Sequence, residues 1–337
     1  MEEESRIKMV MDQYGLNIVS IEKVRSAYKI GTDNGTVCVK KINHGKNKAR
    51  NGEKLVSELR KTGFKNTAEY YRTKDNMSFV RTKNSLYYVT EWIDGEECNL
   101  DDFNEVCKCA ALLAKFHNAA NNIDTKDLRI RNNIKNWPKI FNSNQYELER
   151  FKIKIEGKRL KTEFDKLYYE HIDSFINRGM VALNFLNTSD YYRISREADK
   201  RKTICHDSFY YQNLIKKKDE YFIIDLDSII FDLHINDLGK FIRRLMFKSN
   251  YRWNFEYAQK IINSYCKVRK LSKGELEVML ALIVYPHKFW KLGKKRYVKF
   301  KNWDESKFMH KLSRLTKYDD LEQKFLEDYL IFLEGFS

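Results

Sequence analysis

Proline, glycine and long apolar runs are all scarce in this sequence. The chain of 337 residues contains 2 prolines and 13 glycines, far fewer than a fibrous or low-complexity protein requires. It has no uninterrupted apolar stretch of about eighteen residues, so we expect no membrane span, and its acidic start predicts no secretory signal. With 42% hydrophobic and 14% aromatic residues, the chain is too apolar for intrinsic disorder. A globular protein remains.

Cysteine spacing excludes two further classes of protein. The sequence has six cysteines but no Cys-x-x-Cys pair, which argues against a zinc module and against a disulfide framework. Cys107 and Cys109 lie two residues apart in a helical pattern, so they point to different faces of the expected helix. We therefore expect reduced, mostly buried thiols, as in proteins that fold inside a cell.

The chain has fewer acidic than basic residues. Lysine and arginine together number 63 and aspartate and glutamate 47, so the formal net charge is +16. Such a surplus attracts anionic partners or surfaces, although an AT-rich genome would also produce a lysine-rich composition. Because the basic residues are scattered and no nucleic-acid-binding motif is present, the sequence predicts no sequence-specific binding of nucleic acid.

The chain length and the apolar pattern predict two lobes. At about 150 residues per domain the chain has room for two. The first part alternates like an antiparallel sheet with one helix; the expected strands are near 16–21, 27–30, 36–42, 78–81 and 86–90, and the helix covers 46–62. Beyond residues 92–95 the pattern is mainly helical. We therefore predict an α+β fold with a small β-rich lobe at 1–92 and a large helical lobe at 93–337.

A hairpin interrupts the helical part and carries candidate metal ligands. Two short strands are expected at 214–216 and 221–225, so that Asn213 starts the first and Asp225 ends the second. A tight hairpin would bring the two side chains together. Phosphoryl transfer from a nucleotide uses an asparagine oxygen and a carboxylate of this kind to hold Mg²⁺. The alternative is an ordinary hairpin whose two ends are polar.

Residues His206, Asn213 and Asp225, in this spacing, resemble the catalytic loop and metal motif of the aminoglycoside and choline kinase group. More closely, the chain is similar to the CotS family of spore coat proteins, which shares that kinase-like fold. The similar segments spread from about residue 20 to 315 and include residues 88–98, 113–117, 205–206, 224–227, 231–238 and 283–286. The resemblance implies a bilobal protein-kinase-like fold of the aminoglycoside phosphotransferase type.

The resemblance also implies a place and partners for the protein. Members of this family are spore coat proteins, so we expect cytoplasmic synthesis in the mother cell and deposition in the spore coat. Other coat proteins or anionic surface polymers are then the expected partners. The implied cofactors are ATP and Mg²⁺, with Asn213 and Asp225 as the ligands of the metal.

The sequence departs from the kinase pattern at the catalytic base. The kinase group has His, one residue, Asp, four residues and Asn, but Ser208 stands at the position of that Asp. Asp207 lies one position earlier and would point elsewhere, and we expect a structural role for His206. Losing a general base costs about 10² to 10⁴ in rate. Residues 25–27 also lack the glycine of a nucleotide-covering turn.

These departures predict a coat protein whose phosphoryl transfer is weak or absent. An active ATP- and Mg²⁺-dependent small-molecule or sugar kinase is the alternative. In either case the resemblance assigns Lys40, on the third strand, to the phosphates. It assigns Glu58, or Glu53, as the helix residue that pairs with this lysine. The segment from Glu91 to Ile93 would be the hinge whose backbone contacts adenine.

Several aromatic residues in the last third of the chain lie among lysines: Trp253, Tyr257, Tyr265, Tyr285, Phe289 and Trp290. They could form an interaction face or a polymer-binding groove. Aromatic residues at helical spacing more often belong to a core, so we expect packing.

Overall fold

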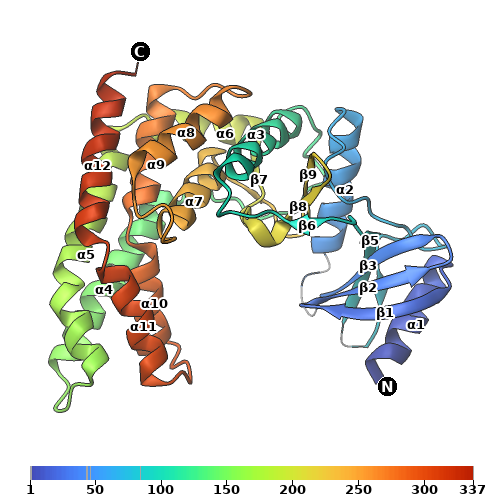
Figure 1. Cartoon of the computed structure of the whole chain (residues 1–337), viewed down its shortest axis with the longest axis horizontal. Helices are drawn as coiled ribbons and strands as arrows, with labels where there is room; N and C mark the ends of the chain where they lie inside the picture. Colours follow the sequence, from blue (N-terminus) through green and yellow to red (C-terminus); the bar gives the residue numbers. More distant parts are fainter. Residues whose placement is uncertain (1, 43–44, 46, 84, 337) are drawn as a thin grey trace. The chain divides into compact units, whose positions relative to one another are not determined.

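The computed structural model describes residues 2–42, 45, 47–83 and 85–336 (Figure 1). The chain forms two compact units. Unit 1 contains Met1–Asn132 and Lys202–Phe231, and unit 2 contains Asn133–Arg201 and Asp232–Ser337. These units are defined by which residues pack together. The expected boundary at residue 92 marks instead the change from a strand pattern to a helical pattern, so it stays a prediction.

Unit 1 contains the predicted antiparallel sheet, whose strand order is β1-β2-β3-β5-β4. Its strands are β1 (Ile18–Val24), β2 (Ala27–Thr32), β3 (Gly35–Ile42), β4 (Val80–Arg81) and β5 (Leu86–Glu91). Thr32 pairs with Gly35 across a two-residue turn, where Gly35 adopts a φ of 113° that favours glycine. Val37 and Val39 on β3 are buried, so Lys40 lies on the opposite face of the strand.

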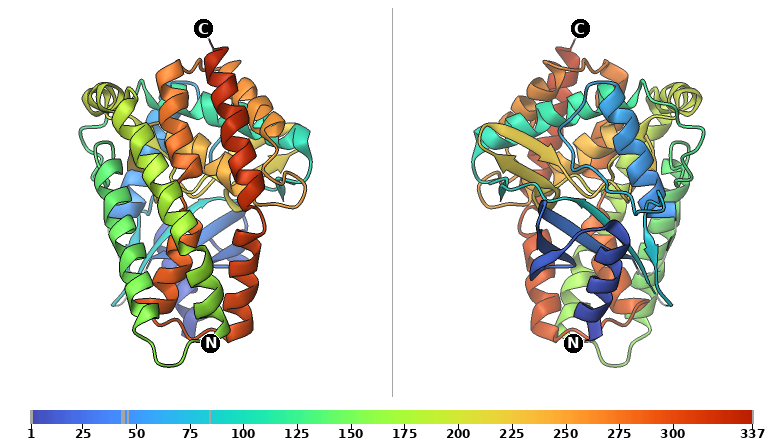
Figure 2. Two further views of the ribbon diagram at one scale, coloured as in Figure 1. Left: turned by 90° about the vertical axis from the view of Figure 1, so that its left-hand side faces the viewer. Right: turned by 90° about the vertical axis from the view of Figure 1, so that its right-hand side faces the viewer.

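An N-terminal helix, α1 (Glu2–Tyr14), covers one face of this sheet (Figure 2). The prediction of a single helix in this region was therefore wrong. Ile7, Val10, Met11 and Tyr14 are all buried, at the spacing of one helical stripe, but the polar residues between them hide the stripe. The one helix that was predicted is present as α2 (Asn47–Lys61); residue 46, where it was expected to start, lies outside the described residues.

The rest of unit 1 contains a helix, several short strands and one 3-10 turn. They are α3 (Phe103–Ala120), β6 (Glu96–Glu97), β7 (Ile204–Cys205), the 3-10 helix η1 (Tyr211–Asn213), β8 (Leu214–Lys217), β9 (Glu220–Ile223) and β10 (Ile230–Phe231). The predicted hairpin is β8–β9, but its ends differ from expectation. Asn213 closes a 3-10 turn by donating its backbone N–H to Tyr210. Asp225 lies beyond β9 because its φ of 66° is incompatible with a strand.

Unit 2 is helical, as expected for this part of the chain. Its helices are α4 (Trp137–Glu156), α5 (Glu163–Thr188), α6 (Tyr191–Arg201), α7 (Ile235–Met246), α8 (Phe255–Cys266), α9 (Lys273–Val284), α10 (His287–Tyr297), α11 (Glu305–Thr316) and α12 (Asp319–Glu334). The long helices α4 and α5 run side by side (Figure 2). Of the six aromatic residues that were expected to pack, Trp253, Tyr265, Tyr285 and Phe289 are each at most 3% exposed. The prediction is confirmed for these four, whereas Tyr257 and Trp290 are half-buried.

The structure bears on the expected state of the cysteines and on the expected absence of a membrane span. All six cysteines are free thiols, in agreement with the expectation of reduced cysteines. Among the described residues, no helix has the length and apolar character that crossing a membrane requires.

Candidate functional site

Lys40 and two aspartates form the centre of the candidate site. The Lys40 ammonium on β3 forms an ion pair with Asp225 and lies 3.5 Å from Oδ2 of Asp227. The side chain of Asp227 is 4% exposed and that of Asp225 is 31% exposed. The structure thus brings together Lys40 and Asp225, which the sequence assigned separately to phosphate and metal. Sequence analysis missed Asp227, although the Asp-x-Asp spacing is a readable signal.

Asp227 is held in place from both of its oxygens. Tyr88 donates its hydroxyl to Oδ2 at 3.1 Å, and Ser228 donates its hydroxyl to Oδ1 at 2.8 Å. The ring of Tyr70 stacks on Tyr88 with the centroids 5.3 Å apart. Because both oxygens of Asp227 already accept hydrogen bonds, the more exposed Asp225 is the carboxylate better placed to bind a cation.

The charges of this site reinforce one another. Burial by itself would raise the pKa of Asp227, but the Lys40 ammonium and the hydrogen bond that the Ser228 hydroxyl donates lower it below its ordinary value. Burial by itself would lower the pKa of Lys40, but the two carboxylates raise it. Lys40 and Asp227 are therefore both charged at neutral pH.

His206 connects the catalytic-type loop to the segment that leads into Asp225. The side chain is fully buried. The backbone N–H of Ser208 donates to Nδ1 at 3.2 Å, so Nδ1 is the acceptor nitrogen of the ring. The proton is then assigned to Nε2, which donates to the carbonyl of Ile224 at 2.9 Å. This histidine thereby sets the position of both chain segments.

Asn213 makes a parallel connection. Its side-chain Nδ2 donates to the carbonyl of Ser208 at 3.0 Å, and its own carbonyl accepts from the N–H of Ile224 at 3.0 Å. Since the amide nitrogen is used within the loop, Oδ1 is the side-chain atom that remains for a cation. Asn213 is thus joined by its backbone to the residue immediately before Asp225.

The loop carries only one carboxylate near the position of the missing base, and that carboxylate is already paired. Asp207 has a φ of 65° and forms an ion pair with Arg131, with the charged atoms 3.1 Å apart. Ser208, at the position of the kinase aspartate, is held through its backbone by His206 and Asn213. The backbone of this loop is thus held by two side chains, while its one carboxylate is engaged with Arg131.

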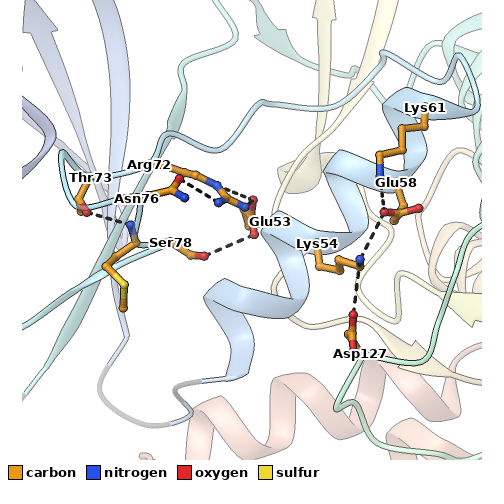
Figure 3. A network of polar contacts seen from close by, with 10 residues as sticks. Glu53, Lys54, Glu58, Lys61, Arg72, Thr73, Asn76, Ser78 and Asp127 are labelled. Atoms are coloured by element: carbon orange, nitrogen blue, oxygen red, sulfur yellow. Dashed lines mark hydrogen bonds and ion pairs between the residues drawn. The ribbon is translucent and has the colours of Figure 1, made fainter.

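The structure does not bring Glu58 or Glu53 to Lys40, so the expected pairing with the α2 helix is corrected. Glu58 contacts Lys61 at 2.8 Å and Lys54 at 3.4 Å on its own helix (Figure 3). The hydrogen bond from Lys61 and the neighbouring ammonium groups lower its pKa. Glu53 instead pairs with Arg72. The physical reason is helical spacing, because residues three or four positions away on α2 are the nearest cations to Glu58.

The expected hinge follows β5. The backbone N–H of Glu91 donates to Glu69 at 2.8 Å, and that of Trp92 donates to Thr36 at 3.3 Å. The side chain of Ile93 is buried. Within the described ranges, the backbone N–H of Ile93 has no hydrogen-bond partner.

The turn between β1 and β2 is tied down at its tip. Arg25 adopts a φ of 55°, in the region where a glycine would be unstrained. Its guanidinium makes a bidentate ion pair with Glu97 on β6, with distances of 2.5 and 2.9 Å. It also lies 6.0 Å from the ring centroid of Tyr211. The absence of a glycine at 25–27 could be read from the sequence, but the ion pair between Arg25 and Glu97 could not.

A strand lysine, a histidine–asparagine loop and an aspartate after the next hairpin are the parts of a kinase-type phosphotransferase fold. Solved structures agree. An aminoglycoside phosphotransferase from Alicyclobacillus acidocaldarius matches with a TM-score of 0.85 and 20% identity, covering 97% of this chain and 96% of its own. Spectinomycin phosphotransferase, solved with ADP and spectinomycin, matches with a TM-score of 0.62 and 14% identity, covering 96% and 98%. The predicted fold class is confirmed.

Sequence comparison narrows this class to one family. The family described as "Spore coat putative kinase YutH" matches residues 7–329, and the chain belongs to that family. Spore coat protein S of Bacillus subtilis (strain 168) is 24% identical over 332 residues, which are 96% of this chain and 94% of that protein. The similarity to spore coat proteins that the sequence motifs indicated is thus confirmed.

Proposed function

We propose that this protein is a spore coat component that binds Mg²⁺-ATP in a kinase-type site but has lost phosphoryl transfer. Its synthesis in the mother cell and its contacts with other coat proteins or anionic polymers are part of this proposal. The observation that carries it is Ser208. A serine hydroxyl is not basic near neutral pH, so it cannot accept the proton of an acceptor hydroxyl as a carboxylate does.

No nearby carboxylate replaces the missing base by default. Asp207 is the adjacent candidate, but its left-handed backbone and its ion pair with Arg131 hold it in a different contact. Rebuilding a base from Asp207 would require breaking that pair and re-aiming the loop. The proposal of lost transfer rests on this pair of facts about Ser208 and Asp207.

The residues that remain fit ATP and Mg²⁺. Asp225 and Oδ1 of Asn213 are oxygen ligands of the kind that Mg²⁺ prefers. Lys40 supplies a cation for phosphate, and the Ile93 N–H with the Glu91 carbonyl supplies a donor and an acceptor for adenine. When bound, Mg²⁺ offsets the charge of the phosphates. Amicoumacin kinase, which shares this fold with a TM-score of 0.61, was solved with AMP-PNP and Ca²⁺.

A second candidate is an active small-molecule or sugar kinase. It is favoured by the retention of Lys40, Asn213 and Asp225 in one unit of the structure. The two candidates share the nucleotide site and differ only in the transfer step. A binding measurement and a turnover measurement on the same protein therefore separate them.

The experiment is a thermal-shift titration with ATP, with and without Mg²⁺, together with a transfer assay over sugars, choline and aminoglycosides. A ligand that binds only the folded state raises the melting temperature, so we expect a Mg²⁺-dependent rise without turnover. Lys40→Ala should abolish the rise. Lys41→Ala is the matched control, because Lys41 lies on the other face of β3 and pairs with Glu3. Robust turnover that Lys40→Ala removes would favour the active kinase.

A further inference from the structure

In unit 2, basic residues are concentrated on α10, α11 and the loop that joins them. Figure 1 labels the two helices. Residues 287–311 contain nine lysines and arginines but only two acidic residues. We define the Trp303 patch as Trp303 with the six lysines Lys291, Lys295, Lys299, Lys301, Lys307 and Lys311. Five of these lysines are exposed and Lys295 is half-buried. This concentration differs from the scattered charge that the sequence suggested.

The lysines of the patch act on one another electrostatically. Burial lowers the pKa of Lys295, and the positive charges of Lys291, Lys311, Lys301 and Lys299 lower it further. Such mutual repulsion is a cost that the folded protein carries until an anion approaches.

The patch lysines lack internal counter-ions, unlike their neighbours. Lys294 pairs with Glu147 at 2.9 Å, and Arg296 pairs with Glu305 at 2.7 Å. None of the six patch lysines forms an ion pair with a carboxylate in the part of the chain that the structure describes. The available acidic side chains thus neutralise Lys294 and Arg296 and leave the six patch lysines without a counter-ion among the described residues.

Trp303 organises the centre of the patch. The ammonium groups of Lys295, Lys307 and Lys311 lie 4.6, 4.9 and 5.4 Å from its ring centroid. The indole itself packs against the aromatic core of unit 2. Three cations on one anchored ring form a partly pre-ordered array, which reduces the side-chain entropy lost on binding.

We propose that the Trp303 patch is a docking surface for an acidic polypeptide segment, meaning a run of aspartate and glutamate side chains on a partner protein. Lysine presents a compact point charge, whereas nucleic-acid and phosphate recognition favours the bidentate fork of arginine. Single-stranded nucleic acid also needs aromatic rings on which to stack. The Trp303 ring is already in contact with the three ammonium groups named above. The ring of Phe300, on the same loop, has the Lys154 ammonium 4.9 Å from its centroid. This docking surface is separate from the nucleotide site and does not depend on it.

The test is a fluorescence-anisotropy titration of the full chain with a short labelled poly-glutamate peptide. Changing Lys295, Lys307 and Lys311 together to Gln should weaken binding by about tenfold, since three partly exposed ion pairs are lost. The matched control changes Lys8, Lys65 and Lys126 to Gln. These three lysines are exposed on other elements, and their loss removes the same charge. Affinity should be unchanged in the control and should fall as salt rises for the native chain.

Three outcomes would overturn the proposal. Equal losses in both triple variants would mean that only net charge matters. Tighter binding of single-stranded RNA than of poly-glutamate, or of anionic vesicles, would assign the patch to another class of partner. If the patch triple fails to fold, the double variant Lys299→Gln with Lys301→Gln, which leaves the Trp303 contacts intact, should still weaken poly-glutamate binding. An unchanged affinity in that double variant would also contradict the proposal.

Discussion

Lys40 and Asp225 form an ion pair although 185 positions separate them in the chain. Asp227 also lies within ion-pair distance of the Lys40 ammonium, and it is the more buried of the two carboxylates. The Lys40 ammonium is therefore balanced by the protein's own acidic side chains, whereas Glu53 and Glu58 of α2 pair with other cations. Several expectations depend on this arrangement.

Removing Lys40 should destabilise the protein. Lys40→Met leaves Asp225 and Asp227 without their cation, and breaking a buried pair costs about 3–5 kcal/mol. The partial exposure of Asp225 reduces this, so we expect about 2 kcal/mol by urea denaturation. Lys41→Met, on the opposite face, should cost less. An equal effect of the two substitutions would contradict the special role of Lys40.

The same pair predicts a difference in acid. The lowered pKa of Asp227 means that its stabilising contribution is present above the unfolded pKa of about 3.9 and is lost as pH falls through the folded value. Without Lys40 that contribution is smaller. The stability difference between the native chain and Lys40→Met should therefore shrink as pH is lowered below about 4. Urea midpoints across this range provide the measurement, and a difference that grows in acid would be inconsistent with the assignment.

Ser208→Asp tests whether the base is the one missing part. The Ser208 backbone is already held by His206 and Asn213, so the new side chain needs no loop rearrangement. If the acceptor site persists, ATP-dependent turnover should rise by about 10² or more. Ser208→Asn is the matched control, since it has similar size but no basic oxygen, and it should remain inactive. A rise in both variants would remove general-base catalysis as the explanation.

Arg25→Gly should strengthen nucleotide binding at little cost in stability. The pair between Arg25 and Glu97 is largely exposed, and such pairs contribute about 0–1 kcal/mol. Glycine accepts the φ of 55° without strain and lets backbone amides approach a phosphate. We expect a larger thermal shift with Mg²⁺-ATP than in the native chain. Glu97→Gln, which releases the same turn but keeps Arg25, shows whether release alone is sufficient.

Gly52→Ala should destabilise the protein despite the helix preference for alanine. A Cβ at Gly52 would lie 2.2 Å from the hydroxyl of Tyr70 and 3.2 Å from the carbonyl of Leu226. Tyr70 supports Tyr88, which holds Asp227, so the strain reaches the site. We expect a loss of about 1–3 kcal/mol by urea denaturation. At Gly157 the nearest atom would be 3.6 Å away, and Gly157→Ala should be neutral or stabilising.

The side chain of Lys288, in unit 2, should lower the free energy of unfolding of the protein at neutral pH. Burial, together with Arg243 and Arg314, lowers its pKa to about 7. A lowered lysine pKa costs stability most below pH 7, and the cost vanishes as pH approaches the unfolded value of about 10.4. Lys288→Met should therefore stabilise the fold by about 2 kcal/mol at pH 6, and by less near pH 10. Urea midpoints at the two pH values check this, and a gain that grows with pH would contradict it.

Much of the local structure could be read from the sequence. The strands of the sheet, α2 and the helices of unit 2 follow from apolar periodicity, which each segment carries within itself. The spacing from His206 to Asn213 and Ser208 in place of aspartate are equally local facts. The sequence missed α1, whose buried stripe of Ile7 and Val10 is diluted by charged residues. An amphipathic search at a period of 3.6 would have found it.

Only the tertiary structure decided which charges meet. The resemblance assigned Glu58, or Glu53, to Lys40 and Asp225 to the metal, and nothing in the pattern around Lys40 indicated that it pairs with Asp225. Coulombic pairing depends on distance in space, and that distance is set by how separate segments pack. The same reason applies to Asp207 with Arg131 and to the Trp303 patch. The identities of the charged residues are thus determined by the sequence, whereas their partners, and the lysines left without one, are determined by the packing of the folded chain.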